Sequence, residues 1–137
     1  MITEDYCSYE VSKLLKERGF NEEIETLITH SGMLYHSDEN SVKREKHTTT
    51  CNSKINIYMD DVSCPTHQMA MKYLREEKHI EIHIAMCALN ADGSREYMYD
   101  IFFTNERYFE KAITKPGFKT FEEAVEAALK YCLTEIL

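Results

Sequence analysis

The clearest structural signal in the chain is the stretch TFEEAVEAALKYCLTEIL, residues 120–137. Thr120 and Glu123 have the spacing of a capping box, in which a hydroxyl and a carboxylate bind free N–H groups at a helix start. The apolar residues that follow recur at helical spacing: Phe121, Ala124, Val125, Ala128, Leu129, Cys132 and Leu133. We therefore predict an amphipathic helix that begins after Thr120 and packs its apolar face against other elements.

A predicted hairpin supplies a surface for that helix. Residues 79–88 alternate between two faces, with Ile80, Ile82, Ile84, Met86 and Ala88 on one of them, which is typical of a strand. Asp92-Gly93 is a two-residue hairpin signal. A tight turn there would place Met86 opposite Tyr99, Ile84 opposite Ile101 and Ile82 opposite Phe103. The final helix is then expected to cover the face made by Ile82, Ile84, Met86, Tyr99 and Ile101.

The rest of the chain adds helices and shorter strands. We predict a helix capped by Thr3 and ending at Arg18, where Gly19-Phe20 provides a left-handed exit with an apolar contact. Other expected elements are a strand pair within 21–37, a strand at 55–59, a helix at 65–78 and a strand around 107–113, with Pro116-Gly117 breaking the chain before the last helix.

These elements predict one α+β domain over residues 1–137. We expect an antiparallel sheet of about four or five strands with three helices packed mainly on one face, in the order α-β-β-α-β-β-β-α. Residues 37–53 are polar and rich in threonine, so they lack the apolar surface that anchors a packed element. We interpret them as a mobile loop.

Composition excludes several classes of protein. The chain has 137 residues, 16 basic and 24 acidic, with the acidic residues spread along its length, which disfavours direct binding to nucleic acid phosphates. Its five cysteines never form a CxxC pair, so we expect reduced thiols and no cofactor. The amino-terminal residues do not resemble a signal peptide, and no run approaches the ~20 apolar residues that cross a bilayer. A cytoplasmic protein that does not bind membranes is expected.

Two segments resemble a known but uncharacterised group of proteins. PTHQMAMKYLRE (residues 65–76) and GFKTFEEAVEAALKYCL (residues 117–133) are similar to a family of short proteins from gut bacteria and their phages or mobile elements. ITEDY (2–6) and LLKERGF (14–20) are similar to the same family, so the resemblance covers about half of the chain. Tyr73 stands where Trp is expected, and residues 38–53 have no counterpart. The resemblance implies a phage-associated protein without an established activity.

The sequence predicts no catalytic residue. Cys64 precedes the helix at 65–78, with His67 nearby, but a nucleophile also needs an oxyanion hole and a group that orients its base. His79, Glu81 and His83 alternate on one predicted strand face, and imidazole and carboxylate groups there could share a divalent metal ion. The same pattern is typical of the solvated face of an antiparallel strand. Metal binding is therefore kept as an alternative.

The predicted binding surface lies on this same side of the hairpin. It combines polar and apolar side chains, and the expected pairing places Met98 opposite Cys87 and Phe102 opposite His83: His83, Cys87, Met98, Asp100 and Phe102. Apolar surface rimmed by charge marks protein association, unless residues 37–53 cover it. The leading hypothesis is a non-enzymatic accessory or adaptor protein that binds another protein, with its oligomeric state left open.

Overall fold

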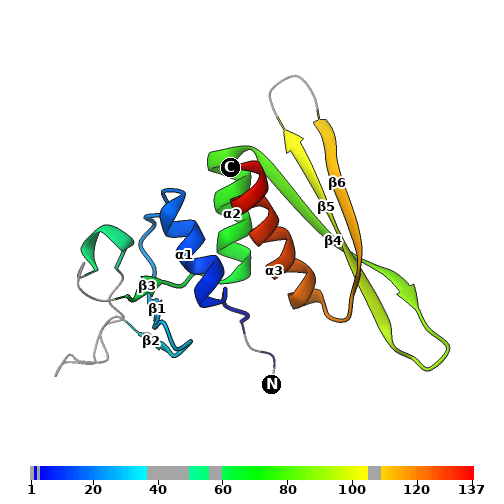
Figure 1. The fold of residues 1–137 in the computed structure, drawn as a ribbon, viewed down its shortest axis with the longest axis horizontal. Coiled ribbons are helices and arrows are strands. Elements are labelled where there is room, and N and C mark those ends of the chain that lie inside the picture. The colour runs from blue at the N-terminus through cyan, green and yellow to red at the C-terminus, as the bar shows by residue number, and fades with distance from the viewer. Residues whose placement is uncertain (1, 3, 37–49, 56–59, 105–108) are drawn as a thin grey trace. The chain divides into compact units, whose positions relative to one another are not determined.

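The computed structural model describes residues 2, 4–36, 50–55, 60–104 and 109–137 (Figure 1). The chain divides into two compact units, Met1–Thr66 and His67–Leu137. The predicted α+β class is confirmed, but the described residues form two three-stranded antiparallel sheets where one sheet of four or five strands was predicted. The predicted order also lacks one strand before the second helix, where Val62–Ser63 pairs. No helix among the described residues is long and apolar enough to cross a membrane.

The first unit places one helix beside a small sheet. Helix α1 spans Tyr9–Glu17 and contacts strand β3, Val62–Ser63. Strands β1 (Thr26–Ile28) and β2 (Leu34–His36) complete the sheet, with β1 in the centre. Ile28 and Val62 are paired and, together with Cys64, form a buried cluster.

The ends of α1 show how local chemistry sets its length. The Ser8 hydroxyl accepts a hydrogen bond of 3.2 Å from the Val11 N–H, so the helix begins at Tyr9 and the predicted start after Thr3 is wrong. Thr3 itself lies outside the described residues. The predicted exit is confirmed: Gly19 has φ 92°, and the Phe20 N–H donates to the Leu15 carbonyl at 2.9 Å.

The end of the predicted loop is packed into the first unit. Residues 37–49 lie outside the described residues, as do residues 56–59 of the predicted strand at 55–59. Cys51 and Asn52, by contrast, are buried, and a short 3₁₀ helix covers Asn52–Lys54. The Asn52 Nδ2 donates to the Phe20 carbonyl at 2.7 Å, and its Oδ1 accepts from the Ser63 N–H at 3.0 Å. One buried amide thus joins the exit of α1 to β3.

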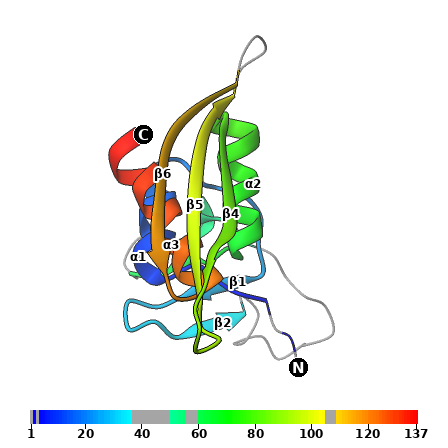
Figure 2. The same ribbon diagram turned by 90° about the vertical axis from the view of Figure 1, so that its right-hand side faces the viewer.

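The second unit is a three-stranded sheet with two helices on one face. Its elements are α2 (His67–Lys78), β4 (Ile80–Leu89), β5 (Arg95–Thr104), β6 (Phe109–Phe118) and α3 (Phe121–Tyr131). Strand β5 lies between β4 and β6. Figure 2 shows this sheet toward the viewer with α2 and α3 behind it. Helix α2 contacts β4, and α3 contacts all three strands.

The final helix packs as its pattern predicts over most of its length. Val125, Leu129 and Leu133 are fully buried, and so are the sheet residues Tyr99 and Ile101. The capping box is confirmed in part, because the Glu123 N–H donates to the Thr120 hydroxyl while the Glu123 carboxylate accepts from the N–H of the preceding Lys119. The last turn differs, since Cys132–Ile136 is π-helical.

The pairing of β4 with β5 differs from the prediction by two residues. Ile84 lies opposite Tyr99, Ile82 opposite Ile101 and Ile80 opposite Phe103. Two features shift the register: a bulge between Met86 and Ala88, and a turn longer than the predicted one, closed by an Asn90 N–H to Ser94 carbonyl bond of 2.8 Å. Each feature shifts the pairing by one residue, and together they give an offset of two, which keeps the same residues facing the helices.

Two predicted features at the edges of this apolar face are also wrong. Met86 and Phe121 belong to the expected core, but they are 53% and 43% exposed. The hairpin extends past the helices in Figure 1, which leaves the end of this face uncovered within the unit. Pro116-Gly117 does not break the chain, because β6 continues through both residues to Phe118. Strand β6 is an edge strand, where a missing N–H costs no ladder bond on the open side.

The structure predicts one reactive thiol among the five cysteines. Cys87 is exposed, whereas Cys7, Cys51, Cys64 and Cys132 are buried. Burial also raises the pKa of the Cys132 thiol to about 12, so this group stays protonated at pH 8 and thiolate chemistry is suppressed. Iodoacetamide at pH 8 is expected to label Cys87 quickly and the other four only after unfolding, measured as mass added per chain. Rapid labelling of a Cys87→Ser variant would contradict this expectation.

Candidate functional site

The candidate site is the side of the second sheet that faces away from α2 and α3, which we call the outer face. Strands β4 and β5 bury Ile80, Ile82, Tyr99 and Ile101 on the helix side, so the alternating residues point the other way. The Asp100–Thr114 pair extends this face onto β6. The outer face consists of Glu81, His83, Ala85, Met98, Asp100, Phe102 and Thr114.

The centre of the outer face is partly apolar. Met98 and Phe102 lie on the central strand and are half-buried. The Phe102 ring contacts the His83 ring, with 4.8 Å between centroids and 50° between planes. Asp100, between the two apolar residues, accepts a hydrogen bond from the Thr114 hydroxyl. Within the second unit, no described element packs over these side chains (Figure 2).

A charged group borders this apolar centre on β4. The Glu81 carboxylate lies 3.7 Å from the Arg75 guanidinium and 3.7 Å from the His83 Nε2. The side chains of Arg75 and His83 are 46% and 52% exposed, so solvent weakens the Arg75–Glu81 attraction, and the His83–Glu81 contact is ionic only when the imidazole is protonated. The Glu81 side chain is itself 23% exposed and remains accessible to a partner.

The structure brings together most of the residues predicted for the binding surface. His83, Met98, Asp100 and Phe102 share the outer face, whereas Cys87 is the extra residue of the β4 bulge. The predicted partners change with the register, because Met98 lies opposite Ala85 and Phe102 opposite Glu81. The alternative prediction was that residues 37–53 cover this face. Most of that segment, residues 37–49, lies outside the described residues, so this alternative stays a prediction.

Of the three residues in the metal-binding alternative, only Glu81 and His83 lie on strand β4. His79 precedes β4 and has a left-handed φ of 57°, the conformation that lets the chain turn from α2 into the strand. Its carbonyl accepts bonds from the Thr104 N–H at 2.9 Å and from the Thr104 hydroxyl. His79, Glu81 and His83 do not form a group whose ligand atoms all lie within 4.8 Å of one another. Glu81 and His83 would need a third ligand from elsewhere.

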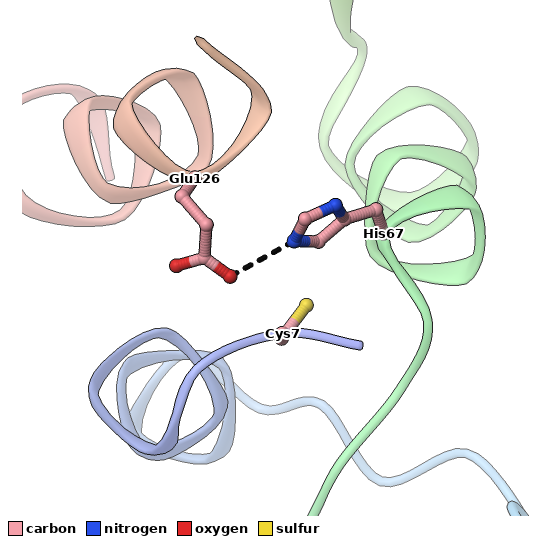
Figure 3. Close-up of side chains that lie close together, drawn as sticks. All are labelled: Cys7, His67 and Glu126. Atoms are coloured by element: carbon pink, nitrogen blue, oxygen red, sulfur yellow. Dashed lines mark hydrogen bonds and ion pairs between the residues drawn. The ribbon is translucent and has the colours of Figure 1, made fainter. Parts of the chain in front are cut away.

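The residues considered for catalysis have structural partners. Cys64 is buried, and its thiol donates to the Cys7 carbonyl at 3.1 Å. His67 begins α2, and its Nε2 lies 2.9 Å from the Glu126 Oε1 of α3 (Figure 3). Because His67 is buried, this pair joins the two helices that cover the sheet. Sequence reasoning missed it, since 59 positions separate the residues and no local pattern connects them.

Two hollows among the described residues lack the features of a small-molecule site. One, of about 540 Å³, lies in the first unit beside Tyr9, Lys13 and His30. The other, of about 520 Å³, lies between the tip of the β4–β5 hairpin and the start of α3. Both are lined mainly by exposed side chains, whereas ligand pockets are concave and largely apolar with a few converging polar groups. The outer face is the stronger candidate.

Comparison with known proteins leaves the function to be argued from the structure. No family model matches the chain, and no significant match was found among curated proteins or solved structures.

Proposed function

We propose that this protein is a non-enzymatic accessory or adaptor protein that binds another protein through the outer face. The observation that carries the proposal is the position of Met98 and Phe102 on the central strand, on the side away from both helices. Burying these two side chains against a partner would remove apolar surface from water, which is the main driving force for protein association.

The polar groups of the outer face suggest the chemistry of the partner. Glu81 and Asp100 carry carboxylates beside the apolar centre, and the chain has an excess of acidic over basic residues. An apolar patch bordered by basic side chains or N–H donors would complement this arrangement. The attraction between the two sets of charges would speed association and orient the complex more than it would strengthen it.

A role without catalysis or a cofactor is also part of the proposal. The buried Cys64 thiol and the His67 imidazole are engaged in hydrogen bonds that hold the fold together. The resemblance of residues 65–76 and 117–133 to short phage-associated proteins supports an accessory role in the cytoplasm of a bacterial host. That part of the proposal rests on sequence alone.

The test compares capture of proteins by three immobilised variants. The native chain and a Met33→Asp control are expected to retain the same protein from a gut-bacterial lysate, because Met33 is exposed but lies in the first unit. Phe102→Asp is expected to lower retention at least tenfold, since it removes a central apolar contact and adds a carboxylate beside Asp100. Circular dichroism checks that all three are folded. Equal retention by Phe102→Asp would exclude the outer face.

A zinc titration separates this proposal from the metal alternative. Binding of one zinc ion per chain by the native protein, lost in His83→Ala, would favour a metal module built on Glu81 and His83. We expect the native protein and His83→Ala to give the same zinc titration, because Glu81 and His83 provide only two of the ligands that a zinc site needs.

A further inference from the structure

The two edges of the second sheet differ in their protection against strand addition. Strand β6 contains Lys115, Pro116 and Gly117, the last with φ 95°, and such residues disfavour pairing with another strand. Strand β4, at the opposite edge, contains no Lys, Arg, Pro or Gly from Ile80 to Leu89. Its only irregularity is the bulge after Met86. From Ile80 to Met86, β4 thus contains none of the residues that disfavour pairing on β6. Arg75 of α2 reaches Glu81 at this edge, but its side chain is 46% exposed and can move aside when a strand pairs.

Hydrogen bonding to β5 fixes which β4 residues point outward. The Thr104 N–H donates to the His79 carbonyl, which makes these opposed residues a hydrogen-bonded pair. Hydrogen-bonded and non-hydrogen-bonded pairs alternate in an antiparallel ladder, so Glu81, His83 and Ala85 bond to β5. The N–H and C=O groups of the intervening residues point away from it: Ile80, Ile82, Ile84 and Met86. Among the described residues, no strand pairs with this edge.

We propose that a second copy of this chain pairs with the free edge of β4. A twofold axis would bring the two β4 strands together in antiparallel orientation, because a symmetric dimer uses the same surface on both subunits. The outward-pointing backbone groups would then bond to one another, and the two sheets would become one continuous sheet. The contact lies at the strand edge and does not depend on the partner proposed for the outer face.

Charge complementarity selects one register for this pairing. With Ile82 on the twofold axis, Ile80 lies opposite Ile84 of the second copy, and Glu81 lies opposite its His83. This arrangement forms two carboxylate–imidazole pairs on the outer face, one on each side of the axis. Moving the axis to Glu81 would oppose two carboxylates, and moving it to His83 would oppose two imidazoles, both of which are less favourable.

The first test measures mass in solution. Light scattering during size exclusion is expected to show a doubling of the monomer mass of 16.1 kDa for the native chain as concentration rises. Ile84→Pro removes one outward N–H while leaving the bonds from β4 to β5, so this variant is expected to remain folded and monomeric. A native chain that stays monomeric up to millimolar concentration would overturn the proposal.

The second test reads the register directly. Glu81→Cys and His83→Cys are made separately in a Cys87→Ser background, which removes the exposed native thiol. Residues opposed in a non-hydrogen-bonded pair lie close enough for a disulfide. Oxidising a mixture of the two variants is expected to give a cross-linked heterodimer, whereas each variant alone is expected to stay uncross-linked. Efficient cross-linking of either variant with itself would exclude this register, and no cross-link in the mixture would exclude the pairing of Glu81 with His83 of the second copy.

Discussion

Replacing Leu129 by alanine is expected to lower the free energy of unfolding by about 2–5 kcal/mol. Leu129 is fully buried in the last turn of α3, in the stripe that contacts the β4–β6 sheet. Removing most of its side chain leaves a cavity beneath the helix that the surrounding core fills only in part. Urea unfolding followed by circular dichroism measures the loss, and an unchanged denaturant slope would show that only stability has changed.

Phe121→Ala provides a matched control for this experiment. Phe121 belongs to the same helical stripe and has a larger side chain, but it is 43% exposed and contacts Tyr97 with ring centroids 6.2 Å apart. Its loss is expected to cost about 1–2 kcal/mol, because close to half of its side chain is already in water and no enclosed cavity forms. If Phe121→Ala cost as much as Leu129→Ala, burial would not be the source of the helix's contribution.

The parts of the fold that the sequence predicted depend on local patterns. The spacing of Val125 and Leu129 and the alternation along β4 each identify an element and its buried face, because the periods of helix and strand differ. Gly19 likewise predicts the end of α1, since a positive φ there favours glycine. These signals require only a few neighbouring residues.

The features that were missed depend on contacts between distant parts of the chain or on small geometric choices. The register of β4 with β5 depends on a bulge near Cys87 and a longer turn, and neither leaves a distinctive pattern of side chains. The His67–Glu126 pair and the burial of Asn52 arise only when separate elements meet. His79 was predicted to lie on β4 because it continues the alternation of the strand. In the structure it adopts a left-handed conformation between α2 and β4, and no local pattern of residues indicates this.

For the candidate site, the sequence predicted which sheet face each residue occupies more reliably than which residues lie opposite one another. The alternation that points Ile82 toward the helices also points His83 outward, whichever register the strands adopt. Met98, Asp100 and Phe102 therefore belong to the outer face under both the predicted and the observed pairing. The order of contacts within that face was wrong, because each depends on the register.

Replacing Asn52 by alanine is expected to lower the free energy of unfolding by about 2–6 kcal/mol. The substitution removes the donor to the Phe20 carbonyl and the acceptor from the Ser63 N–H at once. Asn52 is buried, so the variant loses both bonds where water reaches poorly, and each buried bond lost in this way costs about 1–3 kcal/mol. Urea unfolding of the native and variant chains gives the difference.

Asn21→Ala removes the same kind of interaction at the surface. The Asn21 side chain donates to the Ser53 hydroxyl and accepts from the Ser53 N–H at 2.7 Å, but both residues are exposed. Water can replace these bonds, so a loss below about 1 kcal/mol is expected. Equal losses for the two variants would mean that the number of bonds decides their contribution. A larger loss for Asn52→Ala would show that burial makes this single amide the link between the exit of α1 and strand β3.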